Sequence, residues 1–241
     1  MPDATFRTLV LDAVDAPRLA DFWSTLTRAP LVAASDGDLL VQLVDGGEGL
    51  FVDAVPEPVS GHGRVRVDVQ LPDYDVAALV ATGATLVAEP RDGAQWWVLE
   101  DLEGNQFRAM PPPPPELHVP YVLVPTIYQL CVEAADPAAL ARWWAERTGA
   151  TARTRRASSW WWVDGAAGFP WMFWMFTVQA EPKAVKNRLH WDVWLDGETP
   201  EPLLDAGATL LREPGGDVGW WVLADPEGNE FCAFPASARP A

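Results

Sequence analysis

The sequence predicts an α+β protein built from two copies of one domain. Three observations carry this prediction: a long internal repeat, a capped amphipathic helix near the start of each copy, and a strand of alternating polar and apolar residues in each copy. The segment 101–107, DLEGNQF, returns as 225–231, DPEGNEF, and the segment 83–87 returns as 207–211 at the same offset of 124 residues. Two tandem domains of about 115 to 120 residues each explain this pattern.

Each copy opens with a strand and a capped helix. Residues 6–14 form the first predicted strand, Asp15 is the predicted N-cap, and Pro17 falls in the first helical turn, where its missing N–H does no harm. The second copy repeats this order with Asp136 as the cap and Pro137 at the first helical position. Each helix then carries one apolar stripe, at Leu19, Phe22, Trp23 and Leu26 in the first copy and at Leu140, Trp143 and Trp144 in the second.

Further strands follow each helix. The segments 64–71 and 188–195 are the clearest, because polar and apolar residues alternate along them. After each of them we expect a short helix that ends at Gly83 or Gly207, then two strands joined by the Asp-x-Glu-Gly-Asn turn. Shorter strands are expected at 39–44, 50–55, 159–163 and 172–179. Each copy therefore consists of two βαβββ units, which makes four units in the chain.

A proline run separates the two copies. Residues Pro111 to Pro115 favour polyproline II, which acts as a semi-rigid spacer and not as part of a sheet. We therefore expect a first domain at residues 1–111, a proline-rich linker at 112–124 and a second domain at 125–241. A ligand for a proline-reading protein module is the alternative interpretation of the run.

Composition disfavours several classes of partner. The formal charge of −17 argues against nucleic acid and against anionic membranes, since both need basic contacts. No stretch approaches the ~20 apolar residues of a membrane span, and the amino terminus lacks the basic and apolar regions of a signal peptide. The two cysteines, Cys131 and Cys232, are too few for a disulfide framework. We expect a cytoplasmic protein with free thiols.

Three motifs taken together resemble a known superfamily. They are the opening strand followed by Asp-Ala/Pro-x-x-Leu-Ala-x-Phe/Trp-Trp, the segment 181–192 with the sequence EPKAVKNRLHWD, and the closing segment 225–232 with the sequence DPEGNEFC. This combination resembles the vicinal oxygen chelate superfamily, the glyoxalase/bleomycin-resistance/dioxygenase fold, and within it the glyoxalase-like branch of tandem domains. The resemblance implies that each pair of βαβββ units forms a curved, half-open barrel sheet with helices outside and a ligand cup on the concave face.

Strand alternation indicates which side chains face that cup. In the segment 188–195 we expect the apolar set to pack on the helices and the other set, Arg188, His190, Asp192 and Trp194, to face the cup or solvent. In the segment 64–71 the corresponding polar set is Arg64, Arg66, Asp68 and Gln70. The same phase places these residues of the first and last strands on the inner face: Gln129, Cys131, Glu133, Glu230, Cys232 and Phe234 in the second domain, and Thr8, Val10, Asp12, Gln106, Arg108 and Met110 in the first.

The resemblance also allows the metal sites of the superfamily to be checked. Metal-using relatives hold the ion with His or Gln on the first strand, His on the fifth and Glu on the last, and these positions in the first domain are Thr8, Arg66 and Arg108. Guanidinium groups stay protonated and offer no lone pair, so we expect no metal there. Arg66 and Arg108 then either form a clamp for an anion or carboxylate, or are solvated or paired with Asp68 and Asp12.

The same positions in the second domain are Gln129, His190 and Cys232. A Gln/His/Cys set can bind Zn²⁺ but matches the oxygen-rich sites of Mn²⁺ or Fe²⁺ poorly, so we expect no metal cofactor. The alternative is a divalent metal in the second domain, with oxygen ligands from Asp192 or Glu133. His190 has two further interpretations: a neutral histidine bonded to Asp192 or to a backbone group, or a general base positioned by a carboxylate.

We therefore predict a metal-independent protein that binds an aromatic or polycyclic small molecule in a tryptophan-rich cup. Stacking on some of the fourteen tryptophans would supply affinity, and polar side chains would fix orientation. Relatives of this sort sequester antibiotics or act on specialised metabolites. The predicted ligand-binding residues are Arg66, Arg108, Asp68, Arg188, Trp194, Gln129, Cys232 and Trp174, and the predicted catalytic residues, if the protein is an enzyme, are His190, Asp192 and Glu133.

Two other functions stay open from the sequence. One is an enzyme of the same fold (a lyase, isomerase, dioxygenase or cyclase) that uses His190 as a general base or as a ligand of a divalent metal. The other is an interaction or scaffold role for the acidic surface and the proline spacer. The partner that we expect is an aromatic small molecule, bound by a monomer with paired tandem domains or by a homodimer.

Overall fold

The computed structural model describes residues 2–33, 38–43, 49–61, 63–73, 75–91, 94–112, 122–156, 158–179, 181–216 and 218–240. Most of the expected linker 112–124, with His118, lies outside these residues, and so does His62. Across the described ranges, no helix has the length and apolar character needed to cross a membrane.

The secondary structure follows the predicted order of four βαβββ modules. Module 1 contains β1 (Ala4–Ala13), α1 (Ala16–Thr27), β2 (Leu31–Ala33), β3 (Leu39–Val41) and β4 (Leu50–Ala54). Module 2 contains β5 (Val65–Gln70), α2 (Ala77–Ala81), β6 (Thr85–Ala88), β7 (Trp97–Glu100) and β8 (Gln106–Met110). Module 3 contains β9 (Thr126–Ala134), α3 (Pro137–Arg147), β10 (Thr151–Thr154), β11 (Trp161–Asp164) and β12 (Phe173–Val178). Module 4 contains β13 (Leu189–Leu195), α4 (Glu201–Asp205), β14 (Thr209–Arg212), β15 (Trp221–Ala224) and β16 (Glu230–Phe234), followed by a 3-10 turn at Ala236–Ala238.

Within the described residues these strands form two open eight-stranded sheets. One sheet has the order β14-β15-β16-β13-β1-β4-β3-β2 and joins module 4 to module 1. The other has the order β10-β11-β12-β9-β5-β8-β7-β6 and joins module 3 to module 2. The α+β class, the module order and the construction of each sheet from two βαβββ modules are as predicted. The two modules in a sheet come from different sequence copies: module 4 pairs with module 1, and module 3 with module 2. All four modules carry similar edge strands, so the repeat by itself does not determine which module pairs with which.

The chain divides into two compact units that cut across the sequence halves. The first compact unit contains Met1–Val10, Gly61–Val65 and Cys131–Ala241, and the second contains Leu11–Ser60 and Arg66–Leu130. Strands β1 and β9 are therefore each divided between the two units. The domain boundaries at residues 1–111, 112–124 and 125–241 describe the sequence repeat, and they stay a prediction.

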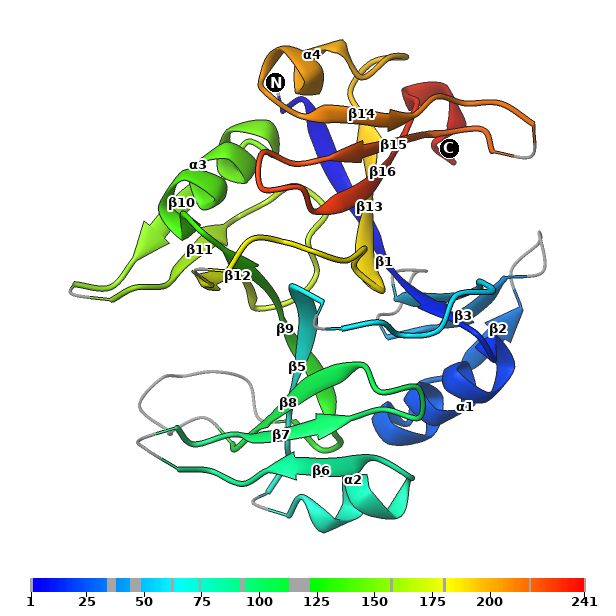
Figure 1. Ribbon diagram of the computed structural model, residues 1–241, viewed down its shortest axis with the longest axis vertical. Helices are drawn as coiled ribbons and strands as arrows, with labels where there is room; N and C mark the ends of the chain where they lie inside the picture. Colours follow the sequence, from blue (N-terminus) through cyan, green and yellow to red (C-terminus); the bar gives the residue numbers. More distant parts are fainter. Residues whose placement is uncertain are drawn as a thin grey trace. The chain divides into compact units, whose positions relative to one another are not determined.

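The core of the first compact unit is a cluster of aromatic rings beneath α3. Trp144 of α3 is fully buried, and its ring centroid lies 4.9 Å from that of Trp174, 5.2 Å from Trp191 and 5.1 Å from Phe231. Phe6 at the start of β1 packs edge-on against Trp174 at 5.7 Å. Figure 1 shows α3 alongside strands β10 to β12. These contacts explain the apolar stripe of the helix and why the first residues of the chain belong to this unit.

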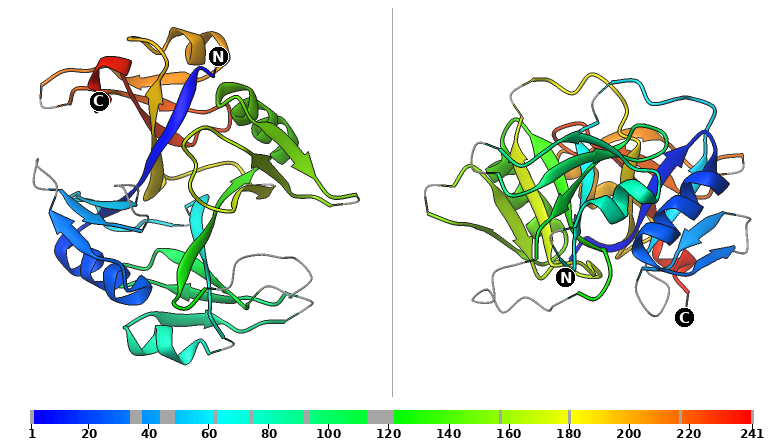
Figure 2. Two further views of the ribbon diagram at one scale, coloured as in Figure 1. Left: turned by 180° about the vertical axis from the view of Figure 1, so that it is seen from behind. Right: turned by 90° about the horizontal axis from the view of Figure 1, so that it is seen from below.

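The second compact unit repeats this packing with smaller residues. Helix α1 lies against β3 and β4, as Figures 1 and 2 show from several directions. Its Trp23 lies 5.2 Å from Phe107 of β8, which is the repeat counterpart of the Trp144–Phe231 pair. Leu19 and Leu26 of the same stripe are buried beside it. The duplicated sequence thus encodes the same helix-on-sheet contact twice.

The repeated Asp-x-Glu-Gly-Asn turn ties the end of each first strand to the last hairpin of a unit. Its glutamate accepts two hydrogen bonds from the backbone just before the long helix. The bonds run from Val14 and Asp15 to Glu103 at 2.9 and 2.8 Å, and from Ala135 and Asp136 to Glu227 at 2.9 and 2.7 Å. The motif is therefore a structural clamp, and this role accounts for its repetition in both copies.

The aspartate of the same turn holds the hairpin together. Asp225 accepts hydrogen bonds from the backbone and the side-chain amide of Asn229, and Trp144 donates to it at 3.2 Å. Burial raises the pKa of Asp225 to about 6, although these N–H donors oppose the shift. Asp101 makes the same contacts to Asn105, and burial raises its pKa as well. The turns close with Gly104 at φ 87° and Gly228 at φ 84°, where a side chain would be strained.

Several local predictions are confirmed. The carboxylates of Asp15 and Asp136 accept hydrogen bonds from the third residue after each, as N-caps do. Gly83 and Gly207 have φ values of 110° and 104° just after the two short helices. Strands β2 and β10 were not expected. Both are short edge strands with mostly exposed residues, so they lack the apolar alternation by which a strand is recognised.

Candidate functional site

Strand β13 presents two chemically different faces. Trp191 packs under α3 against Trp144, while Asp192 and Trp194 contact Arg7 of β1. These contacts match the alternation expected for the segment 188–195. In the parallel register of β13 and β16, Asp192 lies beside Cys232 and Trp194 beside Phe234. We call the side opposite α3 the β13 face, formed by Arg7, His190, Asp192, Trp194, Cys232 and Phe234, all in the first compact unit.

Arg7 is the central polar group of the β13 face. Its Nη1 donates to Oδ2 of Asp192 at 3.1 Å, and the Asp192 side chain is only 7% exposed. Its guanidinium carbon lies 4.7 Å from the ring centroid of Trp194 and 4.2 Å from that of Phe234. A planar cation held by a buried carboxylate and two aromatic rings keeps one orientation, because each contact restricts it in a different direction.

The sequence-based reading missed Arg7. It placed Thr8, Val10 and Asp12 of the opening strand on the inner face, whereas Arg7 is the residue that reaches Asp192. The reason is that β1 is almost completely buried, so its residues show no simple alternation of polar and apolar side chains. The available signal was Arg7 itself, the one basic residue of β1, since a guanidinium in a mostly buried strand needs a partner.

Aromatic rings extend from Arg7 across the β13 face. Phe234 stacks on Trp220 with ring centroids 4.9 Å apart and meets the edge of Trp194 at 5.5 Å. All three rings are half-buried, so part of each is open to solvent. Half-exposed rings beside a fixed cation form a surface suited to a planar aromatic molecule.

The β13 face also carries a cluster of metal-binding groups. Ligand atoms of His190, Asp192 and Cys232 all lie within 4.8 Å of one another. Imidazole, carboxylate and thiolate together suit Zn²⁺. However, Asp192 is already the partner of the Arg7 guanidinium, and a fixed positive charge at this distance opposes a divalent cation. His190, Asp192 and Cys232 can therefore bind a metal together only if the ion pair between Arg7 and Asp192 breaks.

A second set of predicted residues meets in the second compact unit. The Gln129 amide donates to Oδ2 of Asp68 at 2.6 Å, and Nε of Arg66 lies 3.4 Å from Oδ1 of the same carboxylate. Arg108 places its guanidinium 4.7 Å from the ring centroid of Trp96. Gln129 is thus a partner of Asp68, whereas the sequence grouped it with His190 and Cys232. A carboxylate held by an amide and a guanidinium does not fit a metal.

The remaining predicted residues lie in varied surroundings. Trp174 is fully buried among Phe6, Trp144 and Trp191, which corrects the expectation that its ring faces a ligand. Arg188 is half-buried just before β13. Glu133 is 9% exposed, and its backbone N–H donates to the carbonyl of residue 64. Among the described residues, Glu133 is not part of the cluster around His190.

Comparison with solved structures identifies the same architecture in an enzyme from maize, Zea mays. Glyoxalase I from maize matches with a TM-score of 0.59 and 12% identity over 97% of this chain and 93% of that chain. A single-residue variant of that enzyme matches with a TM-score of 0.62 and 13% identity over 98% of this chain and 95% of that chain. At these identities the likeness concerns the fold alone.

A shorter protein also matches part of the chain. A glyoxalase/bleomycin resistance protein/dioxygenase family enzyme from Burkholderia phytofirmans covers 44% of this chain and 97% of its own, with 19% identity and a TM-score of 0.36. Among curated proteins, none matches the sequence.

The family itself follows from a direct match of the sequence. The model of the glyoxalase-like domain matches twice, at residues 8–110 and 129–234. These two matches include both Asp-x-Glu-Gly-Asn turns and β13 with His190. Together with the four βαβββ modules and the two open sheets, they show that the chain belongs to the glyoxalase-like family of the vicinal oxygen chelate superfamily.

Proposed function

We propose that the chain binds an aromatic or polycyclic small molecule without a metal, and that the β13 face is the binding surface. The observation that carries this proposal is the position of Arg7, held between Asp192 and the rings of Trp194 and Phe234. Arg7 supplies the positive charge that a metal supplies in other members of the superfamily. The half-exposed rings beside it offer stacking area, and Arg7 can orient a polar substituent of the ligand.

Two further features support a binding protein of this kind. Trp220 extends the ring surface by stacking on Phe234, so the aromatic area is larger than one side chain. Cys131 and Cys232 are both free thiols, which suits the cytoplasm that we propose as its compartment. Whether binding serves sequestration or conversion depends on His190, which lies beside Asp192 in the same cluster.

Arg7→Gln is expected to weaken binding of an aromatic ligand by about 10- to 100-fold, because a charged hydrogen-bond donor is lost from a fixed position. Trp194→Leu should weaken it as well, through the loss of ring stacking. The measurement is quenching of tryptophan fluorescence by a panel of polycyclic aromatic compounds, 1-naphthoate among them, followed by calorimetric titration of any compound that quenches.

The matched control is Arg153→Gln. Arg153 also pairs with a carboxylate, Asp164, at 2.6 Å, but both side chains are about half exposed. This variant should bind like the wild type. Absence of binding by every compound in the panel, or equal binding by the wild type and both β13-face variants, would contradict the proposed function.

A second candidate function is that of an enzyme with a divalent metal on the same face. The clustering of His190, Asp192 and Cys232 is the observation that favours it. A bound metal would act as a Lewis acid, and these three residues would hold it. In the absence of metal, His190 can accept or release a proton beside Asp192, which is the role of a general base.

Titration with Zn²⁺ alone separates the two candidates. For the metal-independent protein, the wild type should bind Zn²⁺ weakly, and Arg7→Gln should tighten binding by at least about tenfold, because it frees the Asp192 carboxylate. The double variant Arg7→Gln with His190→Ala should lose this gain. Binding by the wild type with a Kd below about 1 μM would instead favour the metal enzyme.

A further inference from the structure

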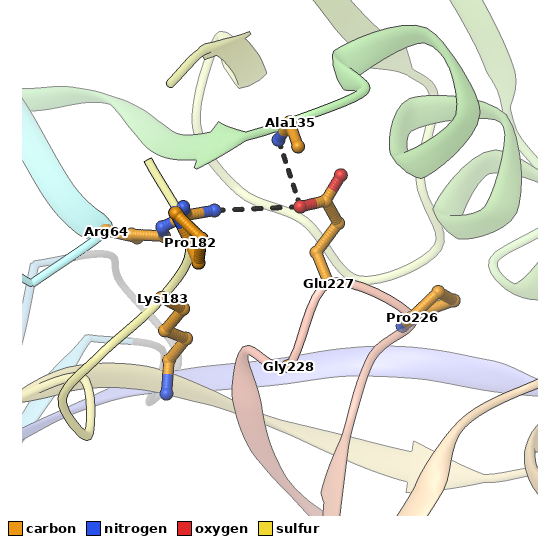
Figure 3. A pocket seen from close by; sticks show the side chains of 7 residues that line it. All are labelled: Arg64, Ala135, Pro182, Lys183, Pro226, Glu227 and Gly228. Atoms are coloured by element: carbon orange, nitrogen blue, oxygen red, sulfur yellow. Dashed lines mark hydrogen bonds and ion pairs between the residues drawn. The ribbon is translucent and has the colours of Figure 1, made fainter. Parts of the chain in front are cut away.

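A pocket of about 440 Å³ lies in the first compact unit and shares no residue with the β13 face. It is lined by Arg64, Ala135, Pro182, Lys183, Pro226, Glu227 and Gly228 (Figure 3). These residues come from the position just before β5, the backbone before α3, the loop before β13 and the turn between β15 and β16. The volume is in the range of small-molecule sites.

Arg64 is the unusual group in this pocket. The residue is 4% exposed, and the contact that its guanidinium makes is a long one, 3.6 Å from Nη1 to Oε2 of Glu227. Its Nη2 has no hydrogen-bond partner within the described part of the chain. A buried guanidinium without a full set of acceptors is unfavourable, since burial removes water without replacing its hydrogen bonds.

The backbone holds Arg64 in this position. Its N–H donates to the side-chain oxygen of Asn187 at 2.8 Å, and its carbonyl accepts from the N–H of Glu133 at 2.8 Å. Asn187 is itself fully buried and bonded to Asn229. The guanidinium is therefore carried by a rigid segment and points toward the pocket wall that contains Glu227 (Figure 3).

The other charges of the pocket are already engaged. Glu227 accepts the two backbone N–H groups of Ala135 and Asp136. Lys183 bonds to Glu230 at 2.5 Å, and Figure 3 shows its ammonium turned away from Arg64 and Glu227. Within the described ranges, the Nη2 group of Arg64 therefore still lacks an acceptor that an added ligand could supply.

We propose that this pocket binds a small aliphatic carboxylate. The carboxylate would accept hydrogen bonds from the Arg64 guanidinium, which is suited to that group, while Pro182, Pro226 and Ala135 enclose the hydrocarbon part. Phosphate fits less well for two reasons. The Glu227 carboxylate repels a dianion more strongly than a carboxylate monoanion, and the two prolines of the wall have no N–H to donate.

The test uses propionate, isobutyrate and inorganic phosphate as probes on the full chain, with ligand-detected NMR and calorimetry. The wild type should bind the two carboxylates more tightly than phosphate. Arg64→Gln should weaken carboxylate binding by at least about tenfold. Ala135→Phe, which fills the pocket and leaves Arg64 intact, should do the same, and a circular-dichroism melt identifies any variant that fails to fold.

Arg153→Gln and Arg7→Gln are the controls, and both should bind propionate like the wild type. This arrangement separates the pocket from the β13 face, because Arg7 lines the β13 face and not the pocket. Unchanged propionate binding in Arg64→Gln or Ala135→Phe would overturn the proposal. So would the absence of carboxylate binding in the wild type, or binding of phosphate as tight as that of propionate, which would indicate an adventitious ion only.

Discussion

Trp144→Ala is expected to lower the free energy of unfolding by about 3–5 kcal/mol. The ring is fully buried, contacts Trp174, Trp191 and Phe231, and donates a hydrogen bond to Asp225. Its removal leaves a large cavity between rigid rings and takes one donor from a buried carboxylate. Equilibrium denaturation in urea, monitored by far-UV circular dichroism, measures the loss.

Two matched variants sharpen this prediction. Trp144→Phe keeps much of the ring packing and should lose clearly less stability. Trp160→Ala removes a half-buried ring near the surface, whose neighbour Trp162 lies at 5.5 Å, and should lose the least. Equal losses for Trp144→Ala and Trp160→Ala would show that the aromatic cluster beneath α3 is not the core of the first compact unit.

As the pH rises from about 4 to about 6, the loss of a proton from Asp225 is expected to lower the free energy of unfolding. Burial raises its pKa from 3.8 to about 6, so at pH 5 the folded state still holds a proton that the unfolded chain has released. The folded state therefore binds more protons in this window, and stability decreases as the pH rises. The contribution of Asp225 to the free energy of unfolding is fully present below pH 3.8 and is lost above about pH 6. It amounts to about 3 kcal/mol, since a pKa difference of one unit corresponds to about 1.4 kcal/mol.

Comparison with Asp225→Asn isolates this effect from the many other carboxylates of the chain. The difference in unfolding free energy between the wild type and the variant should shrink by about 3 kcal/mol from pH 4 to pH 7. Asp101→Asn should show a change in the same direction, because burial raises the pKa of Asp101 as well. A difference that stays constant over this pH range would contradict the prediction.

Local features of the fold could be predicted well from the sequence. The caps Asp15 and Asp136, the glycines after the short helices and the hairpin turns depend on a few adjacent residues, and all are found in the structure. The faces of β13 could also be predicted, because Trp191 and its polar neighbours alternate without interruption. The same caps, glycines and turns occur in both copies of the repeat, so each copy supports the prediction made for the other.

The candidate site was only partly predictable. His190, Asp192, Trp194 and Cys232 lie together as the alternation indicates. Arg7 was missed and Gln129 was grouped with the wrong residues. The contacts of both residues depend on which modules share a sheet, and the repeat does not determine that. Trp174 was placed on the wrong side because the first four residues of β12, Phe-Trp-Met-Phe, are all apolar, so the pattern shows no polar face around Trp174.

The sequence by itself determined the duplicated βαβββ order, the turns and caps that bound its elements, and membership of the glyoxalase-like family. Only the tertiary structure decided that module 1 pairs with module 4 and module 2 with module 3, and therefore that Arg7 meets Asp192 while Gln129 meets Asp68. The physical reason is that caps and turns are satisfied within a few residues. Strand pairing between modules is chosen by long-range packing among edges that the repeat makes nearly alike.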